Sequence, residues 1–163
     1  MTVVPLPALE PNISFEHLPP SPHALEFSFA AKKEALGPHI RERWPWDETY
    51  QREVHRARFS EKPFFSILQG GNAVGTLSWT IRADHARFGE FYLFKAYQGK
   101  GLGTRILEHA LAQADALRLP VRLEYLKWNP AGRLYLRHGF HPTHETDIHV
   151  FLERAPRPPP AGS

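Results

Sequence analysis

The residues best placed to do chemistry are the alternating glycines of Gln98-Gly99-Lys100-Gly101-Leu102-Gly103-Thr104. Residues without side chains let consecutive backbone N–H groups converge on one point, and the N-terminus of a following helix adds a partial positive charge. Lys100 supplies a full positive charge in the same loop. This combination indicates a site for the phosphate groups of a ligand; the alternative is an ordinary glycine-rich turn between a strand and a helix.

Two common phosphate loops do not fit this stretch. A Walker loop needs Ser or Thr directly after its Gly-Lys pair, whereas Lys100 is followed by Gly101. A dinucleotide-binding fingerprint needs a third glycine three residues after the second, whereas Ile106 lies at that offset from Gly103. The loop therefore predicts an anion site of a different kind.

A second motif follows after a predicted helix and strand. It runs from Asn129 through a Leu-Tyr pair that includes Tyr135 to Gly139-Phe140. Taken alone, it is also compatible with a core tyrosine ahead of a glycine that ends a helix. Together with the pattern Gln-x-x-Gly-x-Gly of residues 98–103, however, it resembles the GNAT superfamily of N-acetyltransferases, over about Ile13 to Arg154.

The resemblance implies direct transfer of an acetyl group from acetyl-CoA to a primary amine, which we expect to belong to a small molecule. Two strands are expected to splay apart and to pair with the pantetheine amides of coenzyme A. The resemblance assigns cofactor contacts to the backbone N–H of Leu93, as the oxyanion donor, and to a further set of residues. These are Gln98, Gly99, Lys100, Gly101, Leu102, Gly103 and Thr104 at the diphosphate, with Arg105 as a further charge, and Asn129.

Two residues are expected to move protons. Tyr135 would donate to the leaving sulfur, as the resemblance implies. An amine of pKa about 10 must lose a proton before it attacks. Glu90 resembles a strand-borne glutamate that serves as the base in some family members, and partial burial would raise its pKa toward the useful range. The alternative is a solvent-facing strand residue, with Glu124 and Asp47 as reserve bases.

The acceptor site is less defined by the sequence. Trp44-Pro45-Trp46-Asp47 is either a hydrophobic staple for the helix that Asp47 caps or part of an acceptor pocket. Trp46, Asp47 and Glu124 are our candidates for substrate binding. Two other functions stay open: a protein N-terminus or lysine as the acceptor, and a CoA-binding sensor without catalysis.

The expected elements form an α+β domain of the GNAT type, with a mixed, twisted sheet of about six to seven strands flanked by about four helices. Three antiparallel strands lead into the glycine loop, and a strand-helix-strand unit around the loop predicts one parallel pair. Residues 1–12 are expected to be a flexible arm, residues 13–154 the domain, and residues 155–163 a disordered proline-rich tail. The expected strands are 13–17, 64–68, 73–81, 86–94, 121–126 and a closing strand at 148–152. The expected helices are 22–40, stopped by Gly37-Pro38, then 47–59, 131–138 and one behind the glycine loop. In the helix behind the loop, the residues expected to face inward are Ile106, Leu107, Ala110, Leu111, Ala114 and Leu117.

Composition limits the remaining classes of function. The 163 residues include no cysteine, which excludes disulfides, thiolate metal sites and a cysteine-acyl intermediate. A net charge of +3 suits an anionic cofactor but is too small and dispersed for nucleic acid. No secretory signal or membrane span is apparent, so we expect a cytoplasmic protein. His138, His141 and His144 have poor spacing for a metal, and we expect none. The final strands could pair between two subunits, as in a homodimer.

Overall fold

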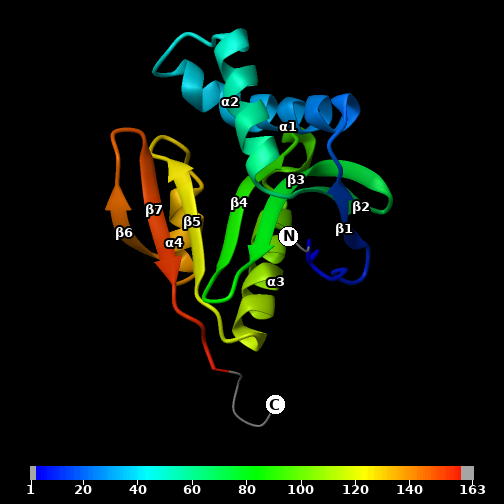
Figure 1. Ribbon diagram of the computed structural model, residues 1–163, viewed down its shortest axis with the longest axis vertical. Helices are drawn as coiled ribbons and strands as arrows, with labels where there is room; N and C mark the ends of the chain where they lie inside the picture. Colours follow the sequence, from blue (N-terminus) through cyan, green and yellow to red (C-terminus); the bar gives the residue numbers. More distant parts are fainter. Residues whose placement is uncertain (1–2, 159–163) are drawn as a thin grey trace.

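The computed structural model describes residues 3–158 and contains a seven-stranded sheet in the order β1-β2-β3-β4-β5-β7-β6 (Figure 1). Neighbouring strands are antiparallel except β4 and β5, which form the predicted parallel pair. The strands are β1 (Ile13–Leu18), β2 (Phe64–Gln69), β3 (Asn72–Ile81), β4 (Ala86–Leu93), β5 (Val121–Leu126), β6 (His141–Glu145) and β7 (His149–Arg154). The expected α+β architecture is confirmed.

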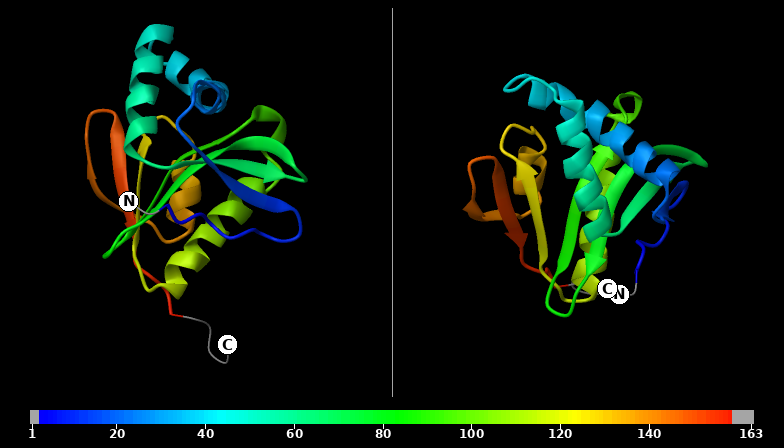
Figure 2. Two further views of the ribbon diagram at one scale, coloured as in Figure 1. Left: turned by 45° about the vertical axis from the view of Figure 1, so that its right-hand side comes forward. Right: turned by 45° about the horizontal axis from the view of Figure 1, so that its top comes forward.

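Helices cover both faces of this sheet. One face carries α1 (Pro22–Arg41) and α2 (Glu48–Glu61), and the other carries α3 (Leu102–Ala116) and the short α4 (Gly132–Arg137) (Figures 1 and 2). Asp47 caps α2 as predicted, because its carboxylate accepts a 3.0 Å hydrogen bond from the N–H of Tyr50. Within residues 3–158, no helix has the length and apolar character needed to cross a membrane.

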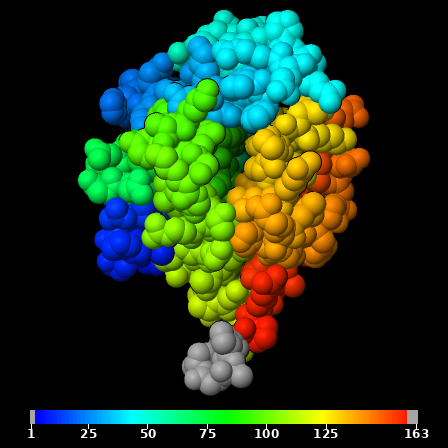
Figure 3. Space-filling model, turned by 180° about the vertical axis from the view of Figure 1, so that it is seen from behind, coloured from blue at the N-terminus to red at the C-terminus, as the bar shows by residue number. Residues whose placement is uncertain are grey.

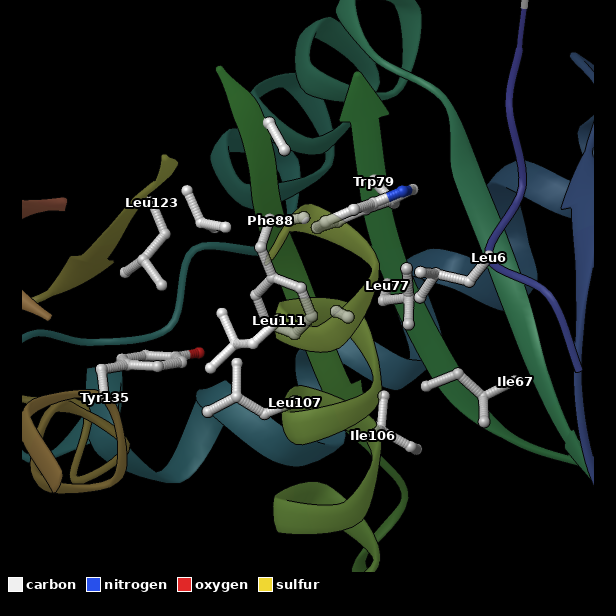
Figure 4. Close-up of a cluster of buried hydrophobic side chains, with 14 of the residues drawn as sticks. Leu6, Ile67, Leu77, Trp79, Phe88, Ile106, Leu107, Leu111, Leu123 and Tyr135 are labelled. Carbon is white, nitrogen blue, oxygen red and sulfur yellow. The ribbon is translucent and has the colours of Figure 1, made fainter. Parts of the chain in front are cut away.

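The core lies between α3 and the sheet (Figure 4). The predicted inward stripe of α3 is buried except at its end. Leu117 is 52% exposed because it is the residue that caps the helix after Ala116, and so it lies beyond the last turn that faces the sheet. The hydrophobic period predicts the buried face of a helix well, but it does not show where that helix ends.

Two other expectations were wrong in detail. Helix α1 does not stop at Gly37-Pro38 but runs through Pro38 to Arg41. The strand at residues 148–152 does not close the sheet, because β6 pairs with β7 on its outer side. Pro142 lies in β6, and a proline in a strand is tolerated best at a sheet edge, so this residue was the missed signal.

The N-terminal residues 3–12 pack against the domain, although we expected a flexible arm. Leu6 is 3% exposed within the core, and the carbonyl oxygen of Pro7 lies 2.7 Å from Nε2 of His109 on α3. Arg105 donates a 3.3 Å hydrogen bond to the carbonyl of Glu10. Of the proline-rich tail, residues 159–163 lie outside the described residues.

A buried histidine joins α1 to α2. Nε2 of His55 lies 2.7 Å from Oγ of Ser28, and its other ring nitrogen, Nδ1, has no hydrogen-bond partner among the described residues. The side chain is 1% exposed and is surrounded by Phe29, Phe59 and Phe64. A protonated ring would bury an unpaired N–H, and this burial together with the positive charge of Lys32 lowers the pKa of His55 from 6.5 to about 4.

This histidine predicts acid-labile folding. Because the unfolded chain binds the proton more tightly, stability is lost as the pH falls from about 6.5 toward about 4. We expect the free energy of unfolding to drop by about 2 kcal/mol between about pH 7 and pH 5. Urea unfolding across this range measures the drop. A His55→Gln variant should lack most of this slope, and an equal slope in the variant would assign it to other groups such as His149, whose pKa is also lowered by burial.

Candidate active site

The centre of the site is the gap where β4 and β5 diverge. These strands pair only at Ala86 with Val121 and at Arg87 with Arg122, and they separate beyond that point. On its other side, β4 contains a bulge, because its register against β3 shifts between Thr76 and Ser78. A bulge bends a strand and re-aims its side chains, so it helps β4 turn away from β5. We call this gap the β4–β5 split.

Glu90 lies at this bulge in a left-handed conformation, with φ of 46°. Such a φ is uncommon for a residue other than glycine and needs support from its surroundings. The hydroxyl of Thr76, which is fully buried, donates a 3.1 Å hydrogen bond to the carbonyl of Glu90. This contact and the flanking strand hold Glu90 in place.

The glycine loop follows the C-terminal end of β4, beyond Glu90 and the 3-10 turn of Lys95–Tyr97. Gly99 and Gly101 have φ of 72° and 80°, which explains why these two positions are glycine. Gly101 is the N-cap of α3, and among the described residues no acceptor pairs with the backbone N–H groups of residues 101–104. Gln98 ties the loop to the strand, because its side-chain amide donates a 2.8 Å hydrogen bond to the carbonyl of Leu93.

The loop therefore offers free donors at the end of a fifteen-residue helix, which is the arrangement that binds anions. Lys95 to Tyr97 form a single 3-10 turn that leads from β4 into the loop. On the face of the sheet that carries α3 and α4, a groove runs between these two helices toward the sheet (Figure 3). The loop lies at one end of that groove, next to the β4–β5 split.

Tyr135 lies on the same side of the sheet, on α4. Its ring is 6% exposed and packs against the rings of Phe88, Tyr125 and Phe140. Figure 4 shows its hydroxyl pointing away from α4 toward Leu111 and Phe88. Burial raises the pKa of Tyr135 above its ordinary value, so the hydroxyl stays protonated. The arrangement provides a neutral hydrogen-bond donor beside the split.

Asn129 begins the turn before α4. Its side-chain oxygen accepts a 3.0 Å hydrogen bond from the N–H of Ala131. This bond orients the start of the segment that carries Tyr135, so Asn129 has a structural task in addition to any contact with a ligand.

The opposite face of the sheet contains a cavity of about 830 Å³ between α1, α2 and strands β3, β4, β5 and β7. Such a volume is ample for a small molecule. The residues that line it include Lys32, Trp44, Asp47, Arg58, Lys62, Arg87, Glu90, Tyr92 and Glu124. Glu90 reaches this cavity from the split, so the cavity and the loop approach the split from opposite faces.

Glu90 is not the solvent-facing residue of the alternative interpretation, since its side chain is only 4% exposed. Its carboxylate lies 3.4 Å from Nζ of Lys62 and 3.5 Å from the guanidinium of Arg58, and it accepts a 3.2 Å hydrogen bond from the hydroxyl of Tyr92. Burial alone would raise the pKa of Glu90. The charges of Lys62, Lys32 and Arg58 outweigh that effect and lower it, so our expectation of a raised pKa was wrong.

The structure places two of the three candidates for substrate binding in the lining of the cavity and the third outside it. Asp47 and Glu124 line the cavity, and Glu124 lies within 3.8 Å of Arg58 and 3.7 Å of Arg87. Trp46 is not part of the lining: its indole packs against Phe29 and donates a 2.8 Å hydrogen bond to Glu48. Its neighbour Trp44 does line the cavity.

The sequence did not reveal Lys32, Arg58 and Lys62 as neighbours of Glu90. Arg58 lies in the last turn of α2, and Lys62 is the C-cap residue that follows this helix, so their closeness in the sequence was the one available signal. Nothing in the sequence indicates that this end of α2 meets β4, 28 residues or more further along the chain.

Comparisons with known proteins agree with this geometry. The family described as Acetyltransferase (GNAT) family matches residues 28–140. The fold is similar to that of PH1933 from Pyrococcus horikoshii OT3, with 21% identity, a TM-score of 0.67 and coverage of 89% of this chain and 99% of that one. The chain matches no curated protein sequence.

Two further solved structures share the fold. The PaiA N-acetyltransferase from Thermoplasma acidophilum, in complex with coenzyme A, is 20% identical with a TM-score of 0.64 and covers 87% of this chain and 99% of its own. The ribosomal-protein-S18-alanine N-acetyltransferase from Escherichia coli is 17% identical with a TM-score of 0.61, covering 93% and 98%. Because the family match spans most of the chain, the chain belongs to the GNAT family and is an acyl-CoA-dependent N-acyltransferase.

Proposed function

We propose that this protein transfers the acetyl group of acetyl-CoA directly to a primary amine of a small molecule. The observation that carries the proposal is the meeting of two sites at the β4–β5 split. The free N–H groups at the start of α3 approach it from one face, and an 830 Å³ cavity approaches it from the other. This arrangement lets an acyl donor and an acceptor reach the same point without sharing a channel.

On the cofactor side, the backbone N–H groups of Gln98 to Thr104 would hold the diphosphate of coenzyme A. The four N–H groups of residues 101–104 have no acceptor in the described part of the chain, so they fit this group. Lys100 is exposed beside them and adds charge, whereas Arg105 also contacts the N-terminal residues. The edges of β4 and β5 at the split would pair with the pantetheine amides, and Asn129 would contribute from the turn before α4.

At the reacting carbonyl, the N–H of Leu93 would stabilise the negative charge that develops on oxygen. Tyr135 would donate a hydrogen bond to the leaving sulfur. The acceptor amine would enter through the cavity, past Asp47, and reach the split near Glu124 and Glu90.

Glu90 would orient the attacking amine and receive its proton. Because the pKa of Glu90 is held low, it is a weak base that would pass the proton on to solvent. The same positive charges that lower this pKa also disfavour a protonated amine nearby. The site would therefore favour the neutral, nucleophilic form of the acceptor.

One structural relative suggests a different acceptor. It bears the name of a ribosomal-protein-S18-alanine N-acetyltransferase, which is the reason to keep a protein N-terminus as the second candidate. The partly enclosed cavity, which α1 and α2 cover on one side, favours a small molecule over a protein chain.

The test is release of free thiol from acetyl-CoA in the presence of small amines, of a peptide with a free N-terminus, or of no acceptor, with the products identified by mass. We expect acceptor-dependent release with small amines. Faster acetylation of the peptide would favour the second candidate. Coenzyme A binding without acceptor-dependent release would contradict the proposal.

A further inference from the structure

The cavity contains a cluster of opposite charges around Glu90, beyond the single carboxylate that the proposed reaction uses to receive a proton. We call it the cation cluster, and it surrounds two carboxylates with more basic groups than they can neutralise. Its members are Lys32, Arg58, Lys62 and Arg87, around Glu90 and Glu124. They come from α1, α2, the C-cap of α2, β4 and β5, so folding brings them together around the split.

The charges in the cluster do not balance. Arg58, Lys62 and Arg87 exceed the two carboxylates by one positive charge, and protonated Lys32 would raise the excess to two. The net charge of the whole cavity lining is also positive, because the lining contains six Lys and Arg residues and four Asp and Glu residues. A partly enclosed cavity with a net positive charge concentrates anions and repels cations.

The pairing within the cluster is also loose. The four nitrogen-to-oxygen distances between 3.4 and 3.8 Å exceed the 2.7–2.9 Å that is typical of charge-assisted hydrogen bonds. Arg58 contacts both carboxylates at long range. A guanidinium has five N–H donors and an ammonium has three, so Arg58 and Lys62 have donors left for another acceptor.

Lys32 provides a further reason to expect an anion. It is 4% exposed, faces the cavity and makes no hydrogen bond or ion pair within the described part of the chain. Burial lowers the pKa of Lys32. An anion bound in the cavity would stabilise its charged form, so Lys32 and the anion would stabilise each other.

We propose that the acceptor is a small primary amine that also carries a carboxylate or phosphate group, and that Arg58 and Lys62 determine this specificity by binding that group. This inference rests on the proposed function. It excludes polyamines as preferred acceptors, because a second positive charge would meet the excess positive charge of the cluster.

The test compares acceptors that differ in the anionic group. The pairs are γ-aminobutyrate with n-butylamine and O-phosphoethanolamine with ethanolamine, and putrescine represents a dication. We expect kcat/KM for at least one anionic amine to exceed that of its neutral partner about 10-fold or more. The two pairs distinguish carboxylate from phosphate as the preferred group.

Variants then locate the specificity. Arg58→Met and Lys62→Met should each lower the ratio of kcat/KM for the anionic amine to kcat/KM for its neutral partner about 10-fold. The ratio is the readout because both side chains also contact Glu90, and a change at Glu90 affects the two acceptors alike. Arg56→Met is the matched control, because Arg56 is exposed on the same helix and does not line the cavity. It should leave both acceptors unchanged.

The results that would contradict the anionic acceptor, the roles of Arg58 and Lys62, and the proposed function differ from one another. Equal or better use of the neutral amines or of putrescine would overturn the anionic acceptor and leave the acetyltransferase proposal intact. Preference for anionic amines that both variants retain would overturn the roles of Arg58 and Lys62. The absence of thiol release with every amine would overturn the proposed function and this inference together.

Discussion

Replacing Tyr135 by phenylalanine should lower kcat by about 10²–10³-fold and leave the affinity for coenzyme A unchanged. The hydroxyl is the only group that this change removes. It points from α4 toward α3 and Phe88, beside the β4–β5 split (Figure 4). The ring packing that positions α4 should survive, because the phenylalanine ring fills the same space among Tyr125, Phe88 and Phe140.

The physical reason is that a thiolate must leave. A thiol has a pKa of about 8.5, whereas burial raises the pKa of Tyr135 above its ordinary value of 10.0. Full proton transfer from the tyrosine to the thiolate is therefore unfavourable, and the hydroxyl acts as a hydrogen-bond donor to the developing charge. Because that charge exists only as the bond breaks, the loss should appear in kcat and not in binding.

The measurement is steady-state kinetics together with calorimetric binding of coenzyme A. Tyr97→Phe is the matched control, because Tyr97 is partly buried against the same core but lies before the glycine loop. Unchanged kcat in Tyr135→Phe would remove Tyr135 from the chemistry. Loss of coenzyme A affinity in that variant would indicate a role in binding instead.

The parts of this molecule that the sequence predicted are those with local signals. The positions of Gly99 and Gly101 follow from the left-handed backbone that the loop requires, and the stripe of α3 follows from helical periodicity. Asp47 was recognisable as a cap because its hydrogen bond reaches only three residues ahead. Each of these features depends on residues within one or two turns of one another.

The surroundings of Glu90 could not be predicted in the same way. Its pKa depends on Lys32 of α1, on Arg58 of α2 and on Lys62 directly after α2, all of them far from β4 in the chain. The sequence supports burial of Glu90, and burial alone gives the wrong direction for the pKa. Only the packing of α1 and α2 against β4 decides which effect is larger.

The close approach of β4 to β3 beside the bulge also depends on a residue whose importance appears only in three dimensions. Gly75 on β3 pairs with Leu93 at the end of β4. A Cβ atom at this position would collide with the carbonyl oxygen of Tyr92 and lie 3.0 Å from Cα of Leu93. Both are backbone atoms that cannot rotate away, so β4 itself would have to move.

Gly75→Ala should therefore lower the free energy of unfolding by about 3 kcal/mol, a large effect for one methyl group. Gly89→Ala is the matched control: Gly89 lies on β4 near the same bulge, and a Cβ there would have no atom within 4 Å. Urea unfolding of the two variants measures the difference, and equal stabilities would show that β4 can shift freely at the split. If β4 does shift, the N–H of Leu93 moves with it, so the Gly75 variant should also have a lower kcat. The Gly89 variant should keep the position of Leu93 and therefore its kcat.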